Sequence, residues 1–167
     1  MHDELTKVDI EKMQQELDHR RIELRPLLIE DVKTAREFGD LSENFEYKAA
    51  KREKNRNESR IRYLERMIKT AKVIEVTSAE DEVGLFDEVD LYIEEDDEVQ
   101  TIRLVTTLRQ NALEGRISKE SPVGKAVMGH RVGDRVQIVV NEQYSYAAVI
   151  RAIRKGADDA SMPISSY

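Results

Sequence analysis

Apolar residues recur every three or four positions along the first part of the chain, which predicts a helix over residues 8–38. Arg20 and Arg21 interrupt this repeat. Pro26 should kink the helix or begin a new segment, because proline removes one backbone N–H and crowds the preceding turn. Gly39 is a natural end for the helix. The repeat itself consists of Ile10, Met13, Leu17, Leu24, Leu28, Val32 and Ala35.

A second helical pattern covers residues 43–75, so the two helices should form an antiparallel hairpin joined by a short connection. About 30 residues at ~1.5 Å per residue give an arm of roughly 45 Å. Its apolar seam is strong near Leu64 and Ile68 and thin near Lys54 and Asn57, which predicts a polar far end. The seam consists of Ala50, Asn57, Ile61, Leu64, Ile68 and Ala71.

From about Val83 the pattern changes to alternating strands at 88–93, 99–106, 135–140 and 144–153. Ser121-Pro122 reads as a helix N-cap followed by proline at the first helical position, and Gly129 ends that short helix. The predicted fold class is α+β: an N-terminal antiparallel coiled-coil hairpin and a C-terminal antiparallel sheet with one helix. We expect an arm at residues 1–75, a domain at 80–157 and a flexible tail at 158–167.

Composition limits the class of protein. The 167 residues include no cysteine, which excludes disulfides and thiolate metal sites. No stretch approaches the ~18–20 apolar residues of a membrane span, and no signal-peptide core is visible, so a cytoplasmic protein without a membrane partner is expected. Charge is uneven: residues 1–75 are balanced, and the net charge of -7 comes from residues 76–167.

A dense run of basic residues extends from Lys48 to Lys72, opposed there only by three glutamates. Four of its members recur every four residues and should form one basic helix face: Lys48, Arg52, Arg56 and Arg60. Such a face is either a solvated surface or a contact for a nucleic-acid backbone.

Asp40 and Glu43 lie three residues apart where the second helix should begin. One interpretation makes Asp40 the N-cap and Glu43 the third helical residue, a pair that resembles a capping box. The other uses the same spacing to point both carboxylates outward as a weak Mg²⁺ site. Mg²⁺ usually takes one or two carboxylates plus phosphate oxygens, so another molecule would have to complete the shell.

Two motifs resemble a known family. Residues 35–47 read Ala-Arg-Glu-Phe-Gly-Asp-Leu-Ser-Glu-Asn-Phe-Glu-Tyr, similar to the tip pattern Ala-Arg-Glu-x-Gly-Asp-Leu-x-Glu-Asn-x-Glu-Tyr of the bacterial Gre transcript-cleavage factors. Residues 117–126 read Ile-Ser-Lys-Glu-Ser-Pro-Val-Gly-Lys-Ala, followed by Gly129 and by Val-Gly-Asp at 132–134. Two motifs in the right order make the resemblance specific.

The resemblance implies an accessory factor that is not itself an enzyme and takes no small-molecule substrate. Gre factors insert their coiled coil into the secondary channel of bacterial RNA polymerase and stimulate cleavage of backtracked RNA, while an FKBP-like domain docks outside. The implied catalytic and metal-binding residues are Asp40 and Glu43, sharing Mg²⁺ with the polymerase rather than binding it stably alone. The basic face would steady the nascent RNA 3′ end. Implied tip support comes from Leu41, Ser42, Asn44, Glu46 and Tyr47.

Three departures from the family pattern concern docking: the 106–113 segment, the turn at 141–143, and the N-terminus. The tip resembles GreA, whereas the dense basic run is closer to GreB. Two other functions remain open. One is an inhibitory factor that occupies the same channel, although such a blocker should have altered tip acids. The other is a free-standing coiled-coil nucleic-acid binder, favoured only by the basic run.

Overall fold

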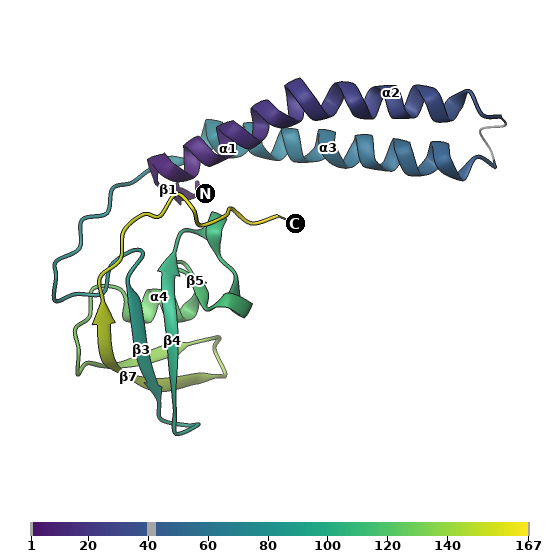
Figure 1. Ribbon diagram of the computed structural model, residues 1–167. Helices are drawn as coiled ribbons and strands as arrows, with labels where there is room; N and C mark the ends of the chain where they lie inside the picture. Colours follow the sequence, from purple (N-terminus) through teal and green to yellow (C-terminus); the bar gives the residue numbers. More distant parts are fainter. Residues whose placement is uncertain (1, 40–42, 167) are drawn as a thin grey trace. The chain divides into compact units, whose positions relative to one another are not determined.

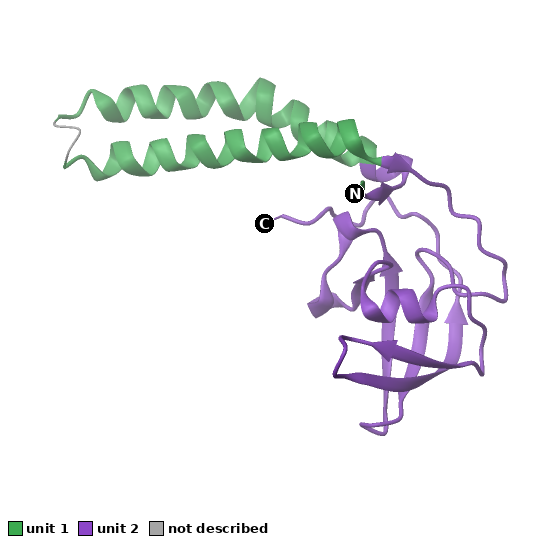
Figure 2. Cartoon of the chain, turned by 180° about the vertical axis from the view of Figure 1, so that it is seen from behind, with its two compact units in different colours: residues 1–2, 10–71 green, residues 3–9, 72–167 purple. Residues whose placement is uncertain are grey.

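The computed structural model describes residues 2–39 and 43–166, which separate into two compact units (Figure 2). One unit is the helical arm, residues 10–71. The other combines residues 3–9 with the chain from residue 72 onward. Residues 3–9, which the predicted boundaries of 1–75 and 80–157 place in the arm, thus group with the C-terminal domain.

The arm is built from α1 (Lys7–His19), a π-helical turn (Arg20–Leu24), α2 (Arg25–Arg36) and α3 (Phe45–Thr70). Helices α2 and α3 lie side by side as an antiparallel hairpin (Figure 1). Pro26 lies in the first turn of α2, where a missing N–H is tolerated, so the prediction of a new segment there is confirmed. Five apolar side chains of the two predicted repeats are buried along the arm: Met13, Leu17, Ala35, Ile61 and Leu64. Met67, which the predicted repeat did not include, is buried as well.

The C-terminal domain contains a five-stranded sheet in the order β5-β4-β3-β7-β6. Its strands are β3 (Glu88–Ile93), β4 (Glu98–Val105), β5 (Arg116–Ser118), β6 (Arg135–Val139) and β7 (Ser145–Arg154). All neighbours pair antiparallel except β4 and β5, which are parallel. Val127 of the short helix α4 (Pro122–Val127) joins the apolar core formed by the sheet, which confirms the predicted α+β class.

Helix α4 begins as its sequence predicts. Ser121 is the N-cap, and its hydroxyl accepts a hydrogen bond from the Gly124 N–H at 3.0 Å. Gly124 packs so closely that an added Cβ would lie 2.3 Å from the Ser118 carbonyl oxygen. Any larger residue would therefore push the helix away from β5, which explains the serine-proline-x-glycine spacing of this motif.

A second, two-stranded sheet joins the start of the chain to the domain. Strand β1 (Glu4–Leu5) pairs in parallel with β2 (Lys72–Val73), an arrangement too short to be visible as alternation in the sequence. The Lys119 ammonium donates a hydrogen bond to the Glu4 carboxylate and lowers the pKa of that group. One residue of the 117–126 motif thus anchors the N-terminal strand.

The C-terminal segment is not the loose tail that was expected. Met162 is buried against Leu85, Phe86 and Val105 in a small apolar cluster. The Ser165 N–H donates to the Leu108 carbonyl at 2.6 Å, and its hydroxyl donates to the Gln110 carbonyl at 3.0 Å. Residues 158–165 therefore pack along the segment that follows β4.

None of the described helices is long and apolar enough to cross a membrane.

Candidate functional site at the end of the helical arm

The chain reverses direction between α2 and α3, and Asn44 fixes where α3 begins. The Asn44 side-chain oxygen accepts a hydrogen bond from the Tyr47 N–H at 3.0 Å, as an N-cap residue does. Its amide nitrogen donates to the Ala35 carbonyl at 2.7 Å, near the end of α2. Gly39 has a φ of +135°, a conformation that L side chains rarely adopt. Asn44 therefore ties the two helix ends together.

This N-cap overturns the helical interpretation of Asp40 and Glu43. Helix α3 begins at Phe45, so Glu43 precedes the helix and cannot be its third residue. The capping-box pairing is wrong, and so is the argument that three-residue spacing places both carboxylates on one helix face. Asp40 lies outside the described residues, together with Leu41 and Ser42 of the predicted tip support.

Of the acids predicted for the site or its support, Glu43 and Glu46 lie within the described residues. Glu43 is exposed just before α3, and Glu46 is exposed in its first turn, where a carboxylate is favoured by the helix dipole. Both border an open hollow that is also lined by Phe38, Asn44 and Phe45. Within residues 2–39 and 43–166, no three acidic, histidine or cysteine side chains converge on a metal position.

Tyr47 connects α3 to α2 and so supports the tip. The Arg36 guanidinium lies over the Tyr47 ring, 5.5 Å from its centroid, and Lys51 lies 6.0 Å from the same centroid. A hydrogen bond from Arg36 lowers the pKa of the Tyr47 phenol, and the charge of Lys51 acts in the same direction. These contacts hold the first turns of α3 beside the last turn of α2.

The predicted basic face is shorter than its sequence spacing indicates. Lys48, Arg52 and Arg56 are exposed along α3. Arg60 is only 4% exposed, and its guanidinium makes two hydrogen bonds with the Glu16 carboxylate, at 2.8 and 3.0 Å. Arg60 is therefore a structural residue of the arm and does not belong to the exposed face.

A polar layer that includes Arg60 crosses the middle of the arm. Arg20 donates to Glu16 at 2.9 Å and to the Asn57 side-chain oxygen at 2.9 Å, and Asn57 donates back to the Arg20 carbonyl. Burial opposes ionisation of Glu16, but the hydrogen bonds from Arg60 and Arg20 outweigh it and lower the Glu16 pKa. Since the partners must match across two helices, the layer fixes the register of the hairpin.

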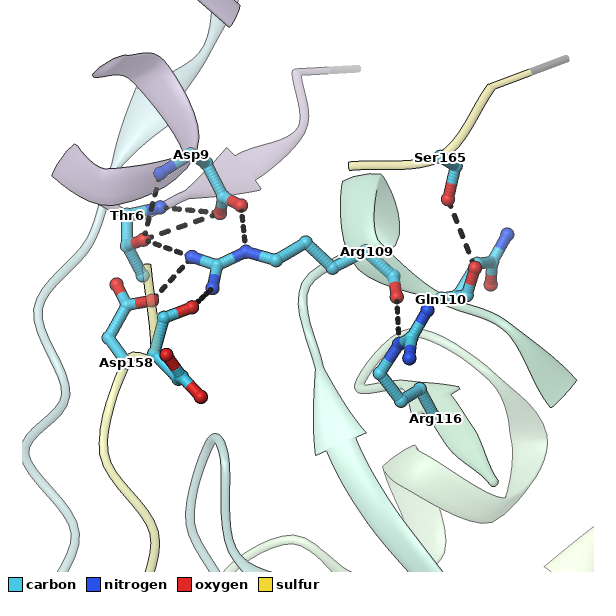
Figure 3. Close-up of polar contacts among 8 residues, drawn as sticks. Thr6, Asp9, Arg109, Gln110, Arg116, Asp158 and Ser165 are labelled. Carbon is cyan, nitrogen blue, oxygen red and sulfur yellow. Dashed lines mark hydrogen bonds and ion pairs between the residues drawn. The ribbon is translucent and has the colours of Figure 1, made fainter. Parts of the chain in front are cut away.

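A second polar cluster lies in the C-terminal domain and is centred on Arg109 (Figure 3). Thr6 and Asp9 form a capping box at the start of α1: the Thr6 N–H donates to the Asp9 carboxylate at 3.0 Å, and the Asp9 N–H donates to the Thr6 hydroxyl at 3.4 Å. Arg109, fully buried, donates to Asp9 at 2.5 Å and pairs with Asp158. Its guanidinium also lies over the Phe86 ring.

The Arg109 cluster gives a role to the 106–113 segment that departs from the family pattern. Arg109 joins three parts of the chain: the start of α1, the segment after β4, and the tail at Asp158 and Asp159. The threonine-x-x-aspartate spacing at residues 6–9 is a recognisable helix-start signal that the helical periodicity alone did not reveal.

The helical arm and the small α+β domain define a two-part protein, and each part contains one of the two motifs found in the sequence. Residues 4–73 match the family model described as transcription elongation factor, N-terminal, and residues 78–155 match the model of the GreA/GreB C-terminal domain. The chain belongs to the GreA/GreB family of transcription elongation factors.

Two curated relatives agree with this assignment. The chain is 42% identical over 135 residues to the transcription elongation factor GreA of Geobacillus kaustophilus, covering 80% of this chain and 85% of that protein. It is 38% identical over 141 residues to GreA of Mesomycoplasma hyopneumoniae, covering 84% and 88%. The solved structure of Gfh1 from Thermus thermophilus is 30% identical, covers 93% of this chain and 100% of its own, and superposes with a TM-score of 0.43.

Proposed function

We propose that this transcription elongation factor enters the secondary channel of bacterial RNA polymerase and stimulates endonucleolytic cleavage of RNA in backtracked complexes. One observation carries the proposal: Glu43 is exposed at the far end of the arm, in a family motif, and helix capping does not account for it. A carboxylate of this kind is available to a partner that the arm reaches. The chain is then an accessory factor, and the catalytic centre belongs to the polymerase.

The donor set at the tip suits a shared ion. Mg²⁺ retains most of its waters and takes one or two protein carboxylates together with phosphate oxygens, and Glu43 offers one such carboxylate, with Asp40 as its predicted partner. When bound, the metal activates the attacking oxygen or stabilises the leaving one in phosphodiester hydrolysis. Asn44 contributes by holding the chain before α3 in place, so that Glu43 is presented rather than folded into the helix.

The three exposed members of the predicted basic face give the arm a second proposed role, which is to contact RNA. Lys48, Arg52 and Arg56 follow the tip along α3 and would contact phosphates of the extruded RNA. The C-terminal domain would dock on the outside of the channel and raise the effective concentration of the tip at the active centre.

The test uses a stalled, backtracked polymerase complex with labelled RNA and Mg²⁺. The full-length protein should shorten the RNA, and Asp40→Asn or Glu43→Gln should slow that shortening at least about tenfold, because each removes one charged ligand. Glu30→Gln is the matched control, since Glu30 is an exposed acid on α2 outside the motif. Both tip variants should still compete with the wild-type protein for polymerase.

Two results would contradict the proposal. If the wild-type protein binds the complex but blocks extension without shortening the RNA, it is an inhibitory channel factor. If both tip variants cleave as well as Glu30→Gln, the tip carboxylates have no part in the reaction.

A further inference from the structure

Two of the three phenylalanines in the chain lie exposed at the tip. Phe38 is 73% exposed just after α2, and Phe45 is 81% exposed at the first position of α3. The third, Phe86, is fully buried in the C-terminal domain. Phe38 and Phe45 border the same open hollow, together with Glu43 and Glu46. Two large aromatic rings exposed beside one hollow indicate a binding site, whereas a single exposed ring is common on protein surfaces and indicates nothing.

Both rings occupy positions that the tip pattern leaves free. In the pattern from Ala35 to Tyr47 the unspecified positions are 38, 42 and 45, so the phenylalanines are additions to the acidic motif rather than parts of it. Neither ring belongs to a buried apolar cluster of the described residues. The Asn44 cap sets Phe45 at the start of the helix, so the backbone at Phe45 is held by the same contacts that hold the backbone at Glu43.

Charge beside the rings indicates the kind of partner. The Lys48 ammonium lies 5.8 Å from the Phe45 ring centroid, and Arg52 continues the exposed cations one turn further along α3. Aromatic faces followed by cations along one groove or helix are the usual means of holding single-stranded nucleic acid, with bases stacked on rings and phosphates near cations. An apolar protein surface would instead be matched by an uninterrupted apolar patch. Here Glu43 and Glu46 line the same hollow as the rings, and Lys48 lies beside Phe45.

We propose that Phe38 and Phe45 stack against the base at the 3′ end of a single-stranded RNA and so position the adjacent phosphodiester beside Glu43. The inference rests on the proposed function and adds two positioning residues and a specific contact, the nucleobase. Stacking of a base on an aromatic side chain is insensitive to sequence, so the contact suits RNA ends of any composition.

The experiment compares two backtracked complexes that differ in one group: the 3′-terminal nucleotide of the RNA either carries its base or is abasic. On the normal RNA, Phe38→Ala and Phe45→Ala should each slow cleavage about tenfold, within the range of one lost stacking contact. On the abasic RNA the wild-type protein should be slowed to a similar degree, and the alanine variants should lose little more. Phe45→Trp should restore cleavage of the normal RNA, because the larger ring can still stack.

Two outcomes would overturn this inference while leaving the proposed function intact, and a third would overturn both. If the alanine variants lose the same factor on normal and abasic RNA, the rings contact the polymerase and not the base. If they lose nothing on either RNA, the rings have no role. If the wild-type protein shortens no RNA at all, the proposed function itself fails. Circular dichroism should show unchanged helix content, since both side chains are exposed.

Discussion

Arg60 in the arm and Arg109 in the C-terminal domain are both buried, at 4% and 0% exposure, yet their surroundings differ. The carboxylate that Arg60 binds, Glu16, keeps 22% of its side chain exposed, so water still reaches the arm's polar layer. Arg109 pairs with Asp9, which is completely buried, and also with Asp158, which keeps 18% of its side chain exposed. The comparison separates two uses of a buried arginine: the first selects a register between two helices, and the second joins segments that are distant in the sequence.

The largest effect is expected at Arg109. Replacing it with methionine, Arg109→Met, leaves the Asp9 carboxylate buried without its cation and should destabilise the domain by about 3–5 kcal/mol. Arg135→Met is the matched control, because Arg135 makes a two-point ion pair with Glu94 at the surface and should cost no more than about 1 kcal/mol. Thermal unfolding followed by calorimetry measures both. Equal, small losses would show that the buried pair contributes nothing.

A smaller effect is expected at Arg60. Arg60→Met removes two hydrogen bonds to Glu16, but Arg20 and water can still satisfy that carboxylate, so the arm should lose about 2 kcal/mol. Arg52→Met, on the exposed face of the same helix, should be close to neutral. Urea unfolding monitored by circular dichroism at the helical band distinguishes them. If Arg60→Met proves as harmless as Arg52→Met, the polar layer does not hold the hairpin.

The smallest effect concerns an ion pair at the surface of the domain and depends on pH. Hydrogen bonds from Arg154 and Thr101 lower the pKa of Asp90 from 3.8 to about 2. A lowered folded-state pKa means that the stabilisation is present above the unfolded value and is lost as the pH falls through the folded value. Asp90→Asn should therefore cost about 1 kcal/mol at pH 7, and its difference from the wild type should vanish between pH 4 and 2. A constant difference across that range would contradict this assignment.

The sequence predicted the main elements because their signals are local. The apolar repeat located α1, α2 and α3, proline marked the start of α2, and alternation located four strands of the large sheet. Strands β1 and β2 have two residues each and pair across a separation of 68 positions, so neither leaves a periodic signal. The packing of the tail escapes sequence analysis for a similar reason, since a few scattered apolar residues such as Met162 and Ile164 give no periodic pattern.

At the tip, the motif placed the candidate residues but not their geometry. Several residues between Gly39 and Phe45 can cap a helix, and only the hydrogen bonds of Asn44 show which of them does. The prediction that Arg60 belongs to the exposed basic face was wrong because a spacing of four residues advances about 40° beyond a full helical turn. Over three steps from Lys48 the row rotates about 120°, which brings Arg60 to the seam between the helices. The roles of Asp40 and Glu43 in cleavage remain predictions.

The Arg109 cluster also constrains the order in which the two parts of the protein can fold while the chain is being synthesised. Asp9 is made 100 residues before Arg109 and still longer before Asp158. The contacts of the arm's hairpin are complete once residue 71 has been made, whereas the first turn of α1 must wait for partners near the other end of the chain. An emerging chain therefore carries an assembled arm before it has a closed domain, and the ion pair between Arg109 and Asp158 forms only after both the arm and the sheet have been made.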